Sequence, residues 1–288
     1  MSLTITLNIF SGRPDPVWTV PDEAAVEFTE RISTIATAST MKPPGVLGGL
    51  GYRGFSVRRD EEAEAMYVHA GIVDAGPASP TLVAGDREIE KWLLSTAGDQ
   101  VPADIKAYVE ESLGTEVTYE ALTVAPFSAG ACPACVATDA PIYNPGAWSF
   151  PPPVQLNNNC YAYANNQITN TFPQPGRGTG HMYTLLGCTG AGAVEPAAVF
   201  DGLVPSPNFG VALAPGSGWY VALVIWPGND YHWYRQDKAG CWSHKPGRTP
   251  VRNVDNSGRA ISDPRTADRG NYTVFCSYMI AKAGLPIR

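Results

Sequence analysis

Residues 219–236 read WYVALVIWPGNDYHWYRQ. The first eight are almost wholly apolar, with β-branched and aromatic side chains, which is typical of a buried strand. The Pro-Gly-Asn-Asp sequence at 227–230 ends this run and predicts a turn. Residues 231–236 then predict a second strand. The stretch therefore predicts a pair of neighbouring strands in the C-terminal half.

The segments around this pair extend the same pattern. Asp-Lys-Ala-Gly at 237–240 predicts a turn into a third strand at 241–243, and residues 272–281 could close the sheet. Residues 160–169 have helical character. The C-terminal half is thus expected to hold one helix followed by a string of antiparallel strands.

The N-terminal part predicts a separate small α+β domain. Residues 3–10 alternate with period two, as a half-buried strand does. Further strands are expected at 51–59 and 66–73, and helices at 21–35, 87–95 and 102–113. We expect an acidic α+β domain at 1–122, a Pro- and Gly-rich linker at 123–156 and a second domain at 157–288. The first domain offers no catalytic cluster.

Composition supports folded domains. Of the 288 residues, 44% are hydrophobic and 16% charged, so a packed core is expected. Residues 1–125 hold 19 Asp and Glu against 9 Lys and Arg, whereas 126–288 hold 8 against 11. Eight of those bases lie within 235–269. They form either solvated loops or a rim that attracts an anionic partner. The net negative charge of the whole chain argues against nucleic acid as a partner.

The N-terminal sequence lacks the features of a secretory leader. It has no basic start and no long apolar run, and no apolar stretch of about 18 residues predicts a membrane span. We expect a protein that is cytoplasmic or exported by a route without a cleaved leader, unless a leader has been removed. The sequence does not decide the oligomeric state.

Cys160 is the first candidate for chemistry. Asn159 precedes it and is a good helix cap, which places the thiol in the first turn of the expected helix. Unpaired N–H groups and the helix dipole there stabilise a thiolate, the form that attacks a carbonyl. The alternative is a buried, inert cysteine.

Two histidines are the candidates for partners. His232 lies on the predicted second strand and could accept the thiol proton. His244 follows 12 residues later, after the Gly-containing turn, and a hairpin would bring both imidazoles to one end of the sheet. A group hydrogen-bonded to His232 would fix its tautomer. Asn253, Asp255 and Asp263 are alternatives for that orienting role.

The order of these residues resembles a known family. Asn-Cys opening a helix, a strand with His and a hairpin to a second His 12 positions on resemble the NlpC-type peptidases of the papain-like superfamily. The resemblance covers 157–245. It implies a helix carrying Cys packed on an antiparallel sheet, and a bacterial enzyme that cuts peptide bonds, including those of cell walls.

The resemblance also assigns roles to residues. Cys160 would be the nucleophile that forms a thioester, His232 the general base and His244 the orienting group. Gln155 would donate to the oxyanion, near Asn159 and the backbone N–H of Cys160. This sequence departs from the family by having Asn159 before the nucleophile and Tyr161 after it. No cofactor is implied, and the substrate would be a peptide or protein.

Aromatic residues leave one binding role open. Five of the seven Trp residues fall in the C-terminal half, among them Trp233 and Trp242. They are expected either to pack in the core or to line a cleft that stacks a sugar or peptide.

Two alternative functions remain. His181, 21 residues after Cys160, is a rival base, and a Cys–His pair of that kind would suit a glutamine deamidase or acyltransferase effector. The third alternative is a non-catalytic module that binds a sugar or peptide, with an inert Cys160.

The remaining cysteines do not predict a metal site. Cys132-Pro-Ala-Cys135 lacks the strand-to-helix context of a redox motif, and the other cysteines are too scattered for zinc. We expect Cys132 and Cys135 to be two thiols or a local disulfide.

Overall fold

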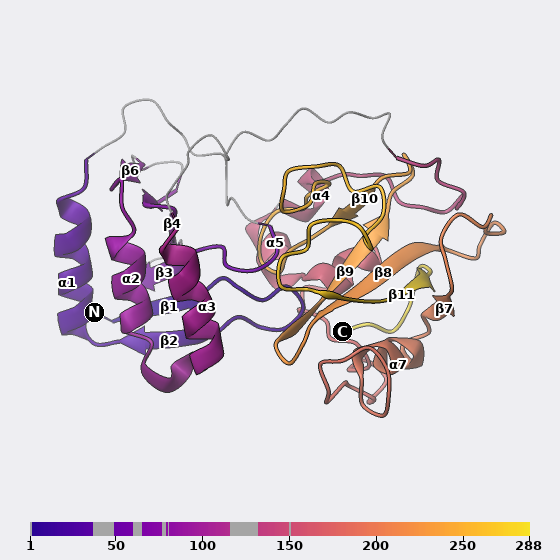
Figure 1. Cartoon of the computed structure of the whole chain (residues 1–288), viewed down its shortest axis with the longest axis horizontal. Coiled ribbons are helices and arrows are strands. Elements are labelled where there is room, and N and C mark those ends of the chain that lie inside the picture. The colour runs from indigo at the N-terminus through magenta and orange to yellow at the C-terminus, as the bar shows by residue number, and fades with distance from the viewer. Residues whose placement is uncertain are drawn as a thin grey trace. The chain divides into compact units, whose positions relative to one another are not determined.

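The computed structural model divides the chain into two compact units, both drawn in Figure 1. Unit 1 comprises Met1–Ile9, Asp15–Leu47 and Tyr52–Thr123, and unit 2 comprises Phe10–Pro14, Gly48–Gly51 and Val124–Arg288. The residues described are 2–36, 49–59, 65–76, 79, 81–115, 132–149 and 151–288. Two short segments of the N-terminal region therefore belong to unit 2, as does the described part of the expected linker.

Unit 1 is built on a six-stranded antiparallel sheet of order β2-β1-β3-β4-β5-β6. The strands are β1 (Leu3–Leu7), β2 (Val17–Val20), β3 (Phe55–Arg59), β4 (Met66–His69), β5 (Ile72–Asp74) and β6 (Leu82–Val83). Leu3, Ile5 and Leu7 are fully buried, which is the period-two pattern read from the sequence.

The helices of unit 1 are α1 (Asp22–Ser33), α2 (Glu88–Ser95), the 3₁₀ turn η1 (Gly98–Gln100) and α3 (Ala103–Leu113). In Figure 1, α2 and α3 lie in front of the sheet and α1 lies beside α2. Phe28 of α1 is fully buried and stacks on Trp92 of α2, with ring centroids 5.9 Å apart. Burying such a ring contributes about 2–3 kcal/mol, so the two helices share one apolar seam.

Unit 2 contains a five-stranded antiparallel sheet of order β10-β9-β8-β11-β7. The strands are β7 (Val204–Ser206), β8 (Trp219–Trp226), β9 (Asp230–Gln236), β10 (Trp242–His244) and β11 (Val274–Ala281). Every residue of β8 and β9 is buried. This explains why β8 is apolar on successive residues: both faces of the strand are covered. The chain thus combines helices with two antiparallel sheets.

The helices of unit 2 are short: α4 (Gly146–Ser149), α5 (Pro152–Asn157), α6 (Cys160–Ala164) and α7 (Val194–Phe200). The expectation that the Cys160 helix continues to residue 169 is wrong. Asn165 caps the C-terminus of α6, and Asn166 has a φ of 49°. That left-handed conformation, which Asn tolerates, cannot continue a right-handed helix.

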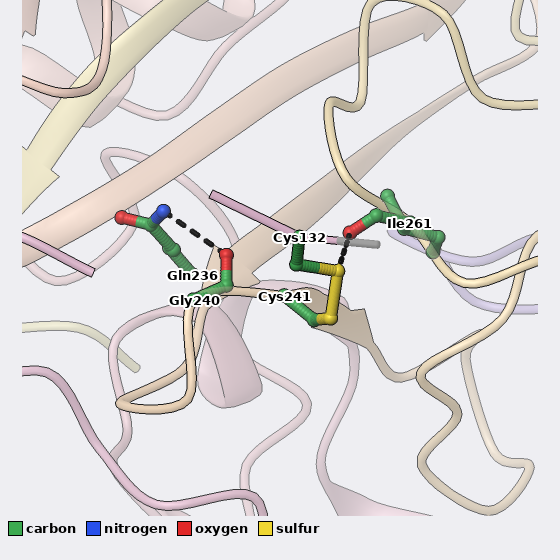
Figure 2. Close-up of a disulfide and its surroundings, with 5 residues drawn as sticks. All are labelled: Cys132, Gln236, Gly240, Cys241 and Ile261. Atoms are coloured by element: carbon green, nitrogen blue, oxygen red, sulfur yellow. Dashed lines mark hydrogen bonds between the residues drawn. A yellow bond between two sulfur atoms is a disulfide. The ribbon is translucent and has the colours of Figure 1, made fainter. Parts of the chain in front are cut away.

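Two disulfides join distant parts of unit 2. Cys132 is bonded to Cys241 and Cys188 to Cys276, across 109 and 88 residues. Figure 2 shows the first, with the Ile261 carbonyl oxygen 3.8 Å from Cys132 Sγ. Neither expectation, two thiols or a local disulfide, is therefore right for Cys132, whereas Cys135 is a free thiol. The reason is topological, because the β9–β10 turn brings Cys241 to Cys132.

Candidate functional site

Cys160 is the first residue of α6, and Asn159 caps that helix. Asn159 Oδ1 accepts hydrogen bonds from the backbone N–H groups of Tyr161 and Ala162, both at 3.1 Å. The side chain satisfies N–H groups that have no partner within the helix, which is why Asn favours this position. Cys160 is completely buried, so the cap holds its thiol inside unit 2.

The hairpin of β9 and β10 brings the two predicted imidazoles together. His244 pairs with Tyr234, and side chains diagonal to each other on one sheet face remain within reach. His244 Nδ1 lies 2.9 Å from His232 Nε2. His244 Nε2 lies 3.1 Å from the Val254 carbonyl oxygen. Both histidines are fully buried.

The Val254 carbonyl sets the direction of this hydrogen-bond chain. Because a carbonyl only accepts, Nε2 of neutral His244 carries the proton and its Nδ1 accepts. His232 then donates through Nε2, which leaves its Nδ1 to accept from the Ser11 hydroxyl. His244 thereby holds His232 in the tautomer that a general base at Nδ1 requires.

A segment distant in sequence completes the site. Residues 10–14, hereafter the strap, lie between β1 and β2 in the chain but belong to unit 2. The Ser11 hydroxyl is hydrogen-bonded to His232 Nδ1 and to the Cys160 thiol. These contacts link Cys160 to His232 through Ser11, and the strap occupies the imidazole nitrogen that faces away from His244.

Asp230 holds the strap through its backbone. The buried carboxylate accepts from three successive N–H groups, those of Ser11, Gly12 and Arg13, the last at 3.0 Å. It also accepts from the Tyr272 hydroxyl at 2.6 Å. Burial raises the pKa of Asp230 to about 6, and these hydrogen bonds oppose the rise.

Three side chains converge on the carbonyl oxygen of Gly12. It accepts from Asn159 Nδ2 at 2.6 Å, Gln174 Nε2 at 2.9 Å and the Tyr231 hydroxyl at 3.1 Å. A carbonyl oxygen has two lone pairs. Three donors directed at one oxygen therefore make its surroundings unusually rich in hydrogen-bond donors. Donors arranged in this way are the type of group that stabilises a developing oxyanion.

The Cys160 thiol is protonated in this arrangement. Burial raises the pKa of Cys160 to about 12, and the negative charge of Asp230 adds to the rise. The hydrogen bonds that the sulfur shares with the Trp233 backbone and the Ser11 hydroxyl lower the pKa by less. The thiolate stabilisation expected from the helix N-terminus is therefore outweighed, because α6 has only five residues and Cys160 is completely buried.

The structure places the other predicted binding residues differently. Asn159 contacts the strap, but the other amide at the Gly12 carbonyl is that of Gln174 instead of Gln155. Gln155 lies on α5, where its backbone carbonyl accepts from Lys245 Nζ at 2.6 Å. Trp233 and Trp242 are fully buried, so they do not line an open cleft: the strands that carry them are covered on both faces.

His181, the alternative candidate for the general base, has its contacts with Phe200 and Thr179. It is exposed, its ring stacks on Phe200 with centroids 3.9 Å apart, and its Nδ1 lies 2.9 Å from the Thr179 carbonyl. Of the alternative orienting groups, Asp255 accepts from backbone N–H groups of its own loop, and Asp263 binds Tyr278 and Arg265. The structure brings His244 to His232 instead.

Sequence reasoning missed four of the residues gathered here: Ser11, Gln174, Asp230 and Tyr231. Asp230 had been assigned only to a turn, and Ser11 lies 149 positions before Cys160 in the sequence. No local pattern marks either residue. Only the short spacing of Asp230 and Tyr231 from His232 offered a signal.

Metal binding and membrane insertion concern the described ranges as well. There, no cluster of three or more His, Cys, Asp or Glu side chains could hold a metal ion. Likewise, none of the described helices is long and apolar enough to cross a membrane.

Comparisons with known proteins give one relative. No family model matches the chain, and no solved structure matches it. The chain is 47% identical over 139 residues to a protein described as insoluble matrix shell protein 1, from Ruditapes philippinarum. The alignment covers 48% of this chain and 87% of that relative.

Proposed function

The chain belongs to the family of insoluble matrix shell protein 1, and from the geometry of its candidate site we propose that unit 2 is a papain-like thiol hydrolase that the strap holds closed. Its reaction would be the cleavage of an amide or peptide bond. The observation that carries the proposal is the hydrogen-bond series Cys160–Ser11–His232–His244. It sets a thiol, a base of defined tautomer and an orienting group in the order that thiol hydrolysis uses.

The reaction follows from these positions once the strap has moved. His232 Nδ1 takes the proton of the Cys160 thiol, and the sulfur forms a bond to the substrate carbonyl carbon. The carbonyl electrons move to oxygen, where Asn159 and the other donors can stabilise them. The C–N bond then breaks, and the amine leaves with the proton from His232. Water hydrolyses the thioester and regenerates the thiol.

Acylation of the thiol tests this proposal. We would incubate the full chain with p-nitrophenyl acetate and locate acetyl groups by peptide mass mapping. Slow acetylation of Cys160 is expected in the wild type and in Cys135→Ser, the control that removes the other free thiol. Ser11→Ala should react faster, since the hydroxyl that occupies His232 Nδ1 is then absent. His232→Ala should lose the reaction.

Acetylation of Cys135 alone, in every variant that retains Cys135, would contradict the proposed function. Mass mapping of Ser11→Ala is the decisive measurement, because a folded variant whose Cys160 stays unreactive has no activated thiol. Thermal unfolding of each variant would confirm that it is folded.

A deamidase or acyltransferase would use the same first step. A deamidase differs in the amide that it attacks. An acyltransferase differs in the nucleophile that reacts with the thioester. Ammonia released from a glutamine side chain would identify deamidation, whereas a new α-amine would identify peptide cleavage.

A second candidate function is that of a non-catalytic matrix component. The enclosed thiol, with its pKa raised to about 12, favours it. Two long-range disulfides and a relative described as an insoluble shell matrix protein agree with a durable protein outside the cell. Under this candidate Cys160 is a core residue, and alkylation by iodoacetamide would proceed only as fast as unit 2 unfolds.

A further inference from the structure

Unit 2 binds the strap mainly through its backbone. Asp230 accepts from the three N–H groups of Ser11, Gly12 and Arg13, and three donors hold the Gly12 carbonyl. Backbone groups are common to all peptides, so this set of contacts can hold any peptide of the same shape.

One position of this site selects its residue by size. A Cβ added at Gly12 would lie 2.4 Å from the Tyr231 ring, far inside contact distance. The backbone of Gly12 lies outside the left-handed region of positive φ. The requirement for glycine is therefore one of space between the strap and Tyr231, and the backbone conformation itself would accept alanine.

The groups that hold the strap are buried and polar. Asn159, Gln174 and Asp230 are each almost fully enclosed. Buried donors and acceptors that lose their partners are costly. The site is therefore complementary to a peptide, and departure of the strap leaves polar groups that another peptide can satisfy.

We propose that this is a recognition site for peptide segments that carry glycine at the position of Gly12, and that the strap occupies it as a built-in pseudo-substrate. The inference rests on the proposed function, because the site adjoins Cys160 and His232. The Ser11 hydroxyl explains why the strap inhibits: it occupies His232 Nδ1, the atom that would take the thiol proton. A segment of another peptide without a hydroxyl at that position would leave the two groups free to meet.

The first experiment opens the site with Gly12→Ala and measures alkylation of Cys160 by iodoacetamide at pH 8. Gly187→Ala is the matched control, because a Cβ there meets only ordinary contacts at 3.6 Å from Leu185. Loss of about three hydrogen bonds, each worth about fivefold in the equilibrium, predicts a rate increase of about a hundredfold in Gly12→Ala. The control should match the wild type.

The second experiment supplies the strap in trans. The peptide acetyl-Phe-Ser-Gly-Arg-Pro-amide, the sequence of residues 10–14, is added to Gly12→Ala. It should restore protection of Cys160, and the same peptide with alanine in place of glycine should not. Equal protection by both peptides, or none by either, would overturn the proposal.

Hydrogen exchange on the wild type covers the case in which Gly12→Ala fails to fold. The amides of Ser11, Gly12 and Arg13 should open with the same equilibrium constant that limits Cys160 alkylation. Alkylation that instead follows the slowest amides of β8 would mean that unit 2 must unfold, and the proposal would fail. None of these measurements uses turnover. Absence of hydrolysis would therefore refute the proposed function alone, and absence of peptide protection would refute the recognition site alone.

Discussion

Protonation of Asp230 is predicted to tighten the closed site. Burial raises the pKa of this carboxyl from 3.8 to about 6 in the folded chain. In the unfolded chain the pKa of Asp is about 3.9. The folded state thus binds the proton more strongly, so stability is greatest below about pH 4, falls as pH rises to about 6, and is then constant.

The magnitude follows from the size of the shift. About two pKa units, at about 1.4 kcal/mol each, give about 3 kcal/mol between pH 4 and pH 8. Urea unfolding across this range would be compared for wild type, Asp230→Asn and the exposed control Asp99→Asn. The stability of wild type relative to Asp230→Asn should fall by about 3 kcal/mol as pH rises, whereas Asp99→Asn should run parallel to the wild type.

The same reasoning applies to the strap. If its release exposes Asp230 to water, the strap should be held more firmly at pH 5 than at pH 8. Hydrogen exchange of the strap amides, corrected for intrinsic rates, measures this. The reasoning would be refuted if the stability of the wild type relative to Asp230→Asn did not change with pH, or if it rose with pH. Either result would mean that the hydrogen bonds to the carboxylate outweigh its burial.

Three further predictions concern stability and activity. Asn159→Ala should lower the free energy of unfolding by about 2 kcal/mol, measured by urea, because α6 loses its cap and the strap loses a donor. His244→Ala should lower any acylation rate of Cys160 by about 100-fold or more, because His232 loses the group that fixes its tautomer, while His244→Asn should retain part of the rate. Replacing Cys188 and Cys276 by serine should cost about 2–4 kcal/mol, measured by thermal unfolding, and an unchanged midpoint would contradict it.

Local sequence patterns predicted the elements that carry the candidate site. The apolar run of β8 and the turn after it placed the hairpin, and the 12-residue spacing brought His244 to His232. The Asn159 cap placed Cys160 at the start of a helix. These predictions succeeded because each depends on hydrogen bonds or side-chain periodicity within about a dozen residues.

Three features were predicted wrongly or left open. They are the length of α6, the disulfide partners and the role of the aromatic residues. Cys132 was expected to be a free thiol or to form a local disulfide with Cys135, yet its partner is 109 residues away. Trp233 was open to a cleft role, but a strand covered on both faces buries it. Sequence spacing does not report which distant strand or loop will cover a given face.

The sequence by itself determined an α+β chain with a capped cysteine and a hairpin of two histidines. Only the tertiary structure decided that the strap belongs to unit 2, that Ser11 is bonded to both the thiol and the imidazole, and that Asp230 holds the strap. It also decided that the Cys160 thiol is protonated, since its pKa depends on burial by residues far away in the chain. Capping and strand periodicity are local and can be read along the chain, whereas burial and long-range hydrogen bonds arise only when distant segments pack together.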